Sequence, residues 1–245
     1  MPIKARLRGD SFDLGRLAEV FPTSDDPSVS VDSEGYYLTS ASLDGDLTAD
    51  ASAMYDRASL LLRDVNGAAR LMISSFRPVE LTGRFSDPAG NVHAVFATDT
   101  ISVRSHVSAS AVVVGPGVAA EAEPTQSAAQ GYVQLAAKHT DVQDVFALLG
   151  KSDPALDWFD LYKIYEIVGD QVAGGPKGRE KALAATGWVT PGDLDAFKAS
   201  ANHQGASGDA ARHARQSGPP PKRTMTIEDA QQMIRVLVSR WLDSL

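Results

Sequence analysis

The sequence predicts an α+β protein, in which an N-terminal antiparallel sheet with one long helix is followed by a C-terminal all-α helical bundle. Two observations lead to this prediction. Before residue 115, apolar and polar residues alternate in several short segments, as they do in half-buried strands. After residue 126 the alternation disappears, and apolar residues recur at spacings of three and four, as they do on the buried face of a helix.

The first part of the chain contains two expected helices and several expected strands. A short helix over Phe12–Phe21 is stopped by Pro22, because proline cannot continue a helix. A long helix follows, with its apolar residues on one face: Met54, Ala58, Leu61, Leu62, Val65, Ala69 and Met72. The expected strands are Ile3–Leu7, Val29–Val31, Tyr36–Leu43, Val79–Phe85, Val92–Ala97 and Ile101–Val114. The last three of these strands, which follow the long helix and are joined by short turns, predict an antiparallel meander packed on that helix in an α+β layer.

A linker separates the two parts. Gly115–Thr125 consists of small residues with two prolines, a composition typical of linkers. We therefore expect a domain over residues 1–117, a linker over 118–125 and a bundle over 126–245. The expected helices of the bundle are Ser127–Lys138, Val142–Leu149, Leu156–Val172, Gly178–Thr186, Pro191–Ala201 and Thr226–Leu245.

The composition excludes several kinds of site. Of the 245 residues, 43% are hydrophobic and 22% are charged, as in an ordinary globular protein. The chain has no cysteine, which excludes disulfides, thiolate catalysis and thiolate-held metals. Its five histidines include no pair at the spacing of a zinc motif, so we expect neither a metal nor a cofactor. No apolar run approaches the length of a membrane helix, and we expect a cytoplasmic protein without a membrane partner.

The charge distribution is uneven. The net charge of −8 disfavours a protein that binds nucleic acid over its whole surface. One stretch, from Lys198 to Arg223, is basic instead, with five lysines and arginines against a single aspartate. This stretch is either a solvated loop that balances nearby carboxylates or a functional basic segment.

Candidate catalytic groups gather in and beside this stretch. Its polar residues of interest are Lys198, Asn202, His203, Asp209, Arg212, His213 and Arg215. If residues 209–215 are helical, the Asp209 carboxylate can hold Arg212 or His213, which lie three and four positions later. A guanidinium grips a phosphate with its planar fork, and a histidine oriented by a carboxylate can act as a general base. Alternatively, Asp209 and the arginines only tie the loop to the bundle.

An aromatic-rich helix is expected just before this segment. In residues 157–168, the side chains of Trp158, Leu161, Tyr162, Tyr165 and Val168 fall on one face. This face predicts packing in the core, and a base-stacking surface is the alternative. Tyr165 and Glu166 are candidates to anchor the polar segment, and with Asn202, Asp209 and Arg215 they form the expected binding residues.

The same residues carry a family resemblance. The aromatic helix over 158–166, the segment ANHQGASGDAARHAR over 201–215, the proline-rich break over 219–226 and the terminal amphipathic helix together resemble a group of bacterial proteins. More distantly, residues 126–245 resemble HEPN domains, helical bundles found in bacterial conflict, toxin–antitoxin and antiphage systems. Catalytic HEPN domains are metal-independent ribonucleases that usually act as dimers, with an Arg, four to six residues and a His. Here the nearest match is Lys198 followed by His203, with a lysine in place of the arginine.

Three functions follow as hypotheses. The first is a non-catalytic module that binds a protein or an RNA in a bacterial defence or stress system. The second is a metal-independent endoribonuclease that uses His203 and His213 with Arg212 and Lys198, in a homodimer formed through the bundle. The third is a small-ligand sensor built on the N-terminal sheet.

Overall fold

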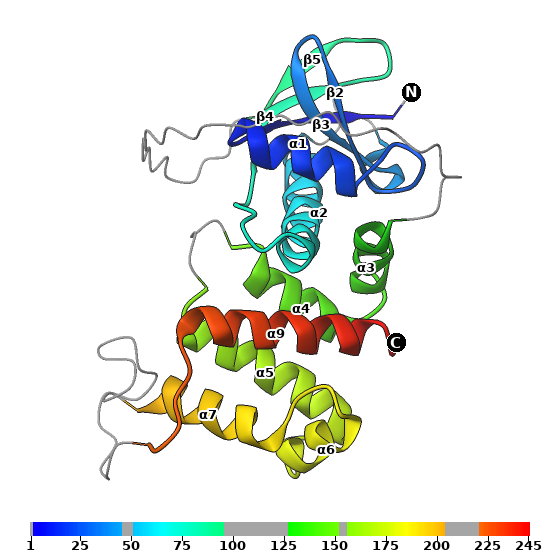
Figure 1. The fold of residues 1–245 in the computed structure, drawn as a ribbon. Helices are drawn as coiled ribbons and strands as arrows, with labels where there is room; N and C mark the ends of the chain where they lie inside the picture. Colours follow the sequence, from blue (N-terminus) through cyan, green and yellow to red (C-terminus); the bar gives the residue numbers. More distant parts are fainter. Residues whose placement is uncertain (1, 46–50, 96–126, 152–155, 204–220) are drawn as a thin grey trace, which may run out of the picture.

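The computed structural model describes residues 2–45, 51–95, 127–151, 156–203 and 221–245. It confirms the predicted fold class. Within the described residues, an antiparallel sheet with a long helix comes first, and every later element is a helix (Figure 1). The expected strand Ile101–Val114 and the expected linker 118–125 lie outside the described residues. The domain boundary therefore stays a prediction.

Five strands of the described chain form one antiparallel sheet in the order β2-β3-β1-β4-β5. Their bounds are β1 (Lys4–Arg8), β2 (Ser28–Asp32), β3 (Gly35–Thr39), β4 (Glu80–Ser86) and β5 (Val92–Ala94). β4 and β5 pair antiparallel as expected, and β1 lies between β3 and β4 at the centre of the sheet, a place that the sequence did not predict. Ile3 just before β1 and Ala5 and Leu7 within it are at most 5% exposed, so this face of the strand is part of the core.

Two helices accompany the sheet. Helix α1 (Ser11–Val20) begins after Asp10, whose carboxylate accepts a hydrogen bond from the Phe12 N–H at 2.9 Å. A short 3₁₀ helix, η1 (Ala41–Leu43), follows β3. Helix α2 (Ala51–Met72) runs along one face of the sheet, with the ring centroid of Tyr55 6.4 Å from that of Phe85 on β4. The sheet and α2 thus form the predicted layer.

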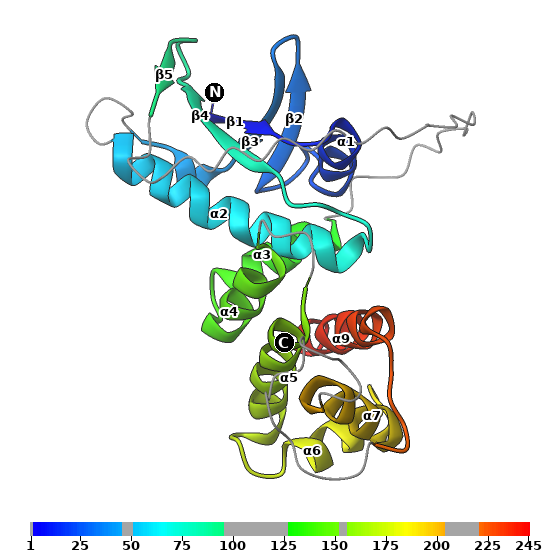
Figure 2. The same ribbon diagram turned by 90° about the vertical axis from the view of Figure 1, so that its left-hand side faces the viewer.

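The next two helices, α3 (Ala128–Ala136) and α4 (Thr140–Leu149), pack on the side of α2 that faces away from the sheet (Figure 2). Glycines permit this approach. A Cβ atom at Gly67 of α2 would lie 2.8 Å from the carbonyl oxygen of Phe146, and one at Gly150 would lie 2.3 Å from that of Arg63. Neither position has room for a side chain, so these two glycines set the distance between α2 and α4.

Hydrogen bonds between distant segments reinforce this packing. The fully buried amide of Gln130 on α3 donates to the carbonyl oxygens of Pro22 and Pro27, at 2.8 and 2.9 Å. Arg70 of α2 donates to the carbonyl oxygen of Leu149 at the end of α4, at 2.9 Å. One continuous apolar core therefore extends from the sheet through α2 into the helical part.

The remaining helices form the end of the molecule away from the sheet (Figures 1 and 2). They are α5 (Trp158–Ala173), α6 (Arg179–Thr186), α7 (Pro191–Asn202) and α9 (Ile227–Leu242). Thr226 begins α9 as predicted, because its hydroxyl accepts from the Asp229 N–H at 3.1 Å. In Figure 1, α9 crosses the front of the molecule, with α2 on one side of it and α7 on the other.

Candidate functional site

The described members of the predicted site lie on two neighbouring helices. Lys198 and Asn202 belong to α7, His203 follows its last residue, and Tyr165 and Glu166 lie on α5. Asp209, Arg212, His213 and Arg215 lie outside the described residues. Their expected roles stay predictions.

Tyr165 is part of the core. It is 2% exposed, and its ring lies 5.4 Å from that of Tyr162 and 5.6 Å from that of Phe197, measured between centroids. Burial raises the pKa of the Tyr165 hydroxyl above its usual range, so this group stays protonated at neutral pH. The expected packing of the aromatic face in the core is confirmed by the burial of Trp158, Leu161, Tyr165 and Val168.

Glu166 and Lys198 form ion pairs inside the helical part. The Glu166 carboxylate lies 3.2 Å from Nη1 of Arg179, whose Nε lies 2.6 Å from Asp170. The ammonium of Lys198 lies 2.6 Å from Oε1 of Glu180. This ion pair joins α6 to α7, and the Glu180 carboxylate offsets the positive charge that Lys198 would offer to a phosphate.

Asn202 and His203 end α7. The Asn202 side-chain amide donates to the carbonyl oxygen of Lys198 at 2.9 Å, and the backbone N–H of His203 donates to that of Ala199 at 3.1 Å. Both bonds close the last turn of the helix. Among the described residues, the structure therefore brings Lys198, Asn202 and His203 together through the helix itself, and it places Tyr165 in the core beneath Phe197.

A second group of residues forms the exposed side of α9. This group was not predicted from the sequence. Gln232, Val236, Ser239 and Asp243 follow one another at spacings of four, three and four, and we call them the outer face of α9. Val236 in its middle is 40% exposed. The only signal in the sequence was a valine within an otherwise polar stripe, and single exposed apolar residues are common.

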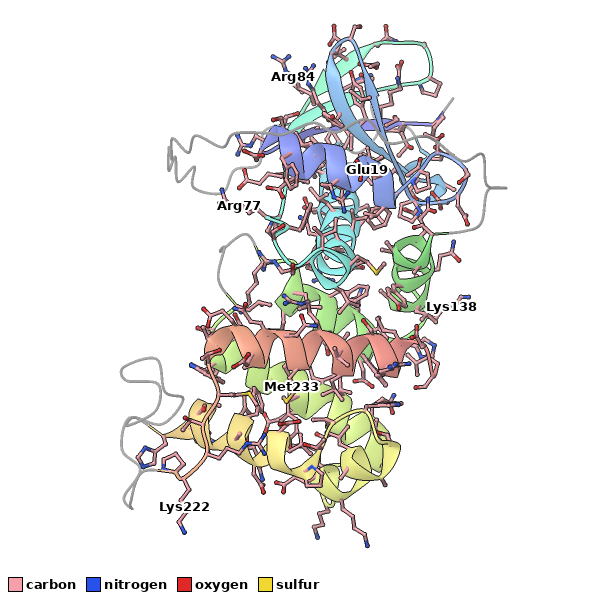
Figure 3. The ribbon with its side chains drawn as sticks, in the orientation of Figure 1. Glu19, Arg77, Arg84, Lys138, Lys222 and Met233 are labelled. Atoms are coloured by element: carbon pink, nitrogen blue, oxygen red, sulfur yellow. The ribbon has the colours of Figure 1, made fainter. Side chains whose placement is uncertain are left out.

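A hollow lies on each side of Val236. The α7-side hollow, of about 470 Å³, is bounded by α9, the start of α7 and the segment before α9. Its apolar lining is Trp188, Val189, Ala196, Met225, Met233 and Val236. Figure 3 labels Met233 on the side of α9 that faces α7. Arg223 spans its rim and pairs with Asp193 at 2.8 Å.

The α2-side hollow, of about 480 Å³, lies between α9 and the end of α2. Val236 and Gln232 line both hollows, so the two adjoin across the outer face of α9. Met72 at the end of α2 is 46% exposed here, beside Arg235 and Arg240. Taken together, the two hollows combine a tryptophan with methionine and arginine side chains, a composition that is enriched in protein–protein interfaces.

The arginines of the α2-side hollow have no acidic partner in the part of the chain that the structure describes. Within the described residues, neither Arg235 nor Arg240 forms an ion pair, and Arg235 donates only to the side-chain oxygen of Gln232, at 2.9 and 3.3 Å. Burial lowers the pKa of Arg235 from its usual value, although the group stays charged at neutral pH. The nearby carboxylate of Asp243 accepts a hydrogen bond from the Tyr132 hydroxyl at 2.9 Å.

No group of three or more His, Asp or Glu side chains in the described part of the chain is arranged to hold a metal ion. Likewise, none of the described helices is long and apolar enough to cross a membrane. No protein-family model matches the chain, and neither a curated protein nor a solved structure is similar to it. The resemblance to HEPN domains is therefore still a prediction.

Proposed function

We propose that this protein is a non-catalytic interaction module that binds a protein partner through the outer face of α9. The observation that supports the proposal is the pair of adjoining hollows on either side of Val236, lined by Trp188, Met225, Met233 and Met72. Tryptophan, methionine and arginine supply much of the binding energy at interfaces, because they bury large areas and form directed contacts.

The described part of the predicted catalytic segment favours the same function. A ribonuclease needs a cation that is open to the phosphate and a base within reach of the 2′-hydroxyl. Lys198, one of the predicted catalytic cations, instead pairs with Glu180 at 2.6 Å. This ion pair stabilises the packing of α6 against α7.

The test places a photo-crosslinking amino acid at position 236 of the full chain, and at Leu60 of α2 as a control. Leu60 is also an exposed apolar residue, 51% exposed, and it precedes Met72 by twelve residues, or about 18 Å along the helix. A protein crosslinked from position 236 and not from position 60 is then purified and titrated against the wild type and the variants Val236→Glu and Leu60→Glu.

We expect Val236→Glu to weaken the binding of this purified protein at least about tenfold, because a carboxylate replaces an apolar contact. Leu60→Glu should bind like the wild type. Equal binding by the wild type and Val236→Glu would contradict the proposal. So would cleavage of RNA by the purified chain in the presence of a chelator, which would favour the ribonuclease hypothesis.

A further inference from the structure

The charges around the α2-side hollow are unbalanced. Arg235 and Arg240 line it without an ion pair in the described chain, and the carboxylate of Asp243 already accepts from Tyr132. In the α7-side hollow, by contrast, the guanidinium of Arg223 is paired with Asp193 at the start of α7. The α2-side hollow therefore presents two cations to whatever occupies it.

Apolar surface lies beside these cations. Met72 and Val236 are 46% and 40% exposed, and both line the same hollow as the two arginines. Burying such side chains contributes about 25 cal/mol for each Å² removed from water. An occupant that matches this surface must carry both carboxylates and apolar side chains.

We propose that the α2-side hollow binds an acidic amphipathic segment of the protein partner, with its carboxylates at Arg235 and Arg240 and its apolar side chains on Met72 and Val236. This inference rests on the proposed function and specifies the chemistry of the partner. Bidentate pairing with a carboxylate is the interaction for which the guanidinium is suited. The acidic remainder of the chain does not prevent it, because charges more than about 8 Å away are largely screened at physiological salt.

RNA fits this surface less well. A nucleic acid follows a continuous line of cations, since each phosphate carries a charge. Here two arginines lie among exposed apolar side chains on a protein of net charge −8. Met72 and Val236 would remain next to phosphates and gain little.

A second copy of the chain fits poorly in two antiparallel registers of α9. If two α9 helices packed antiparallel about a two-fold axis between Val236 and Ser239, Arg235 would face Arg240 of the other copy. An axis at Val236 would place Asp229 opposite Asp243. Both registers bring like charges together, which costs binding energy.

The experiment measures the fluorescence anisotropy of a labelled 14-residue peptide of glutamate and leucine, with the leucines at helical spacing, titrated with the full chain. Two peptides serve as controls, one with lysine in place of glutamate and one with serine in place of leucine. We expect only the glutamate–leucine peptide to bind, and we expect salt to weaken its binding. Failure of this peptide to bind, or equal binding of the lysine peptide, would overturn the proposal.

Charge-removing variants locate the binding. The double variant Arg235→Gln/Arg240→Gln should weaken peptide binding at least about tenfold. The matched control is Arg8→Gln/Arg84→Gln, which removes the same charge from the sheet; Figure 3 shows Arg84 there, far from α9. Arg240→Gln alone, at an exposed position, should weaken binding several-fold, and it keeps the test valid if the double variant unfolds. Equal loss in the control variant would overturn the proposal.

Two further measurements separate the alternatives. If a 14-nucleotide single-stranded RNA binds more tightly than the peptide, and Arg235→Gln/Arg240→Gln loses this binding, the occupant of the hollow is RNA and not an acidic segment. If the chain forms a concentration-dependent dimer that the same variant does not form, the occupant of the hollow is a second copy of the chain. If the crosslinked partner binds this variant normally but fails to bind Val236→Glu, the proposed function holds and the acidic segment is wrong. If it binds both variants normally, both proposals are wrong.

Discussion

The polar face of the sheet and the outer face of α9 differ in whether their cations are paired with carboxylates. On the sheet, each cation of β1 faces a carboxylate: Lys4 lies 3.2 Å from Asp32, Arg6 3.1 Å from Glu34, and Arg8 2.7 Å from Glu80. On α9, Arg235 and Arg240 have no such partner among the described residues. β1 pairs its three cations with carboxylates within the fold, whereas α9 leaves two arginines beside exposed apolar side chains.

This difference separates residues that stabilise the fold from residues that are available for binding. Polar groups that are satisfied within the protein cost stability when they are removed, since their partners lose a bond. Groups that have no bonding partner within the protein cost little stability when they are removed, and their removal affects only binding. The predictions below test this separation, beginning with the largest expected effect.

The largest effect is expected at Asn66 of α2, whose side chain binds the backbone of Val79 just before β4. Its side-chain amide donates to the Val79 carbonyl oxygen at 2.9 Å, and its side-chain oxygen accepts from the Val79 N–H at 3.1 Å, with the residue 4% exposed. Asn66→Ala leaves both backbone groups buried without partners, and we expect the free energy of unfolding to fall by about 3–4 kcal/mol. Urea unfolding at pH 7 measures this change. Asn91→Ala, at an exposed asparagine, should cost less than about 1 kcal/mol, and equal losses would contradict the argument.

Asp64 of α2 differs from the paired carboxylates of the sheet, because Arg63 offsets only part of the cost of burying its charge. Burial raises the pKa of Asp64 to about 6, although Arg63, 3.4 Å away, lowers it in part. The folded state therefore holds the proton more tightly than the unfolded state, whose pKa is near 3.8. The resulting stabilisation is complete below pH 3.8 and is lost as the pH rises through 6.

Asp64→Asn should therefore change how stability depends on pH. At pH 8 the variant avoids the cost of a buried carboxylate, and we expect it to be about 2–3 kcal/mol more stable than the wild type. At pH 4 the two proteins should differ by less than about 1 kcal/mol. Thermal and urea unfolding at both pH values measure the difference. Asp56→Asn, at an exposed position of the same helix, is the control, and a pH dependence shared by both variants would contradict the role of Asp64.

The smallest effects are expected for two variants that each remove one arginine, one from the sheet and one from α9. Arg8→Gln removes an exposed ion pair, and we expect a loss of about 0.2–1 kcal/mol that disappears in 1 M salt. Arg240→Gln removes a cation that has no acidic partner among the described residues, and stability should change by less than about 0.5 kcal/mol at either salt concentration. Urea unfolding at low and high salt compares the two variants. A larger salt-dependent loss for Arg240→Gln than for Arg8→Gln would show that the comparison of the two faces is wrong.

Part of the candidate site could be predicted from the sequence. The aromatic face of α5 and the start of α9 at Thr226 were correct, because helical spacing and N-capping depend on residues close together in the chain. The pairing of Lys198 with Glu180 could not be predicted, since these residues lie on different helices whose packing decides their distance. The hollows beside Val236 were missed for the same reason, because α2, α7 and α9 come together only in the folded chain.

The sequence by itself determined the kinds of element and most of their bounds, from the strands before residue 95 to the helices after residue 127. Alternation, three-and-four spacing, capping residues and prolines act over a few neighbouring positions, so a single chain carries this information. Only the tertiary structure decided that β1 lies at the centre of the sheet and that α4 approaches α2 at Gly67 and Gly150. It also decided that Arg235 and Arg240 lie beside Met72 in one hollow. These outcomes depend on contacts between residues far apart in the chain, which local patterns do not specify.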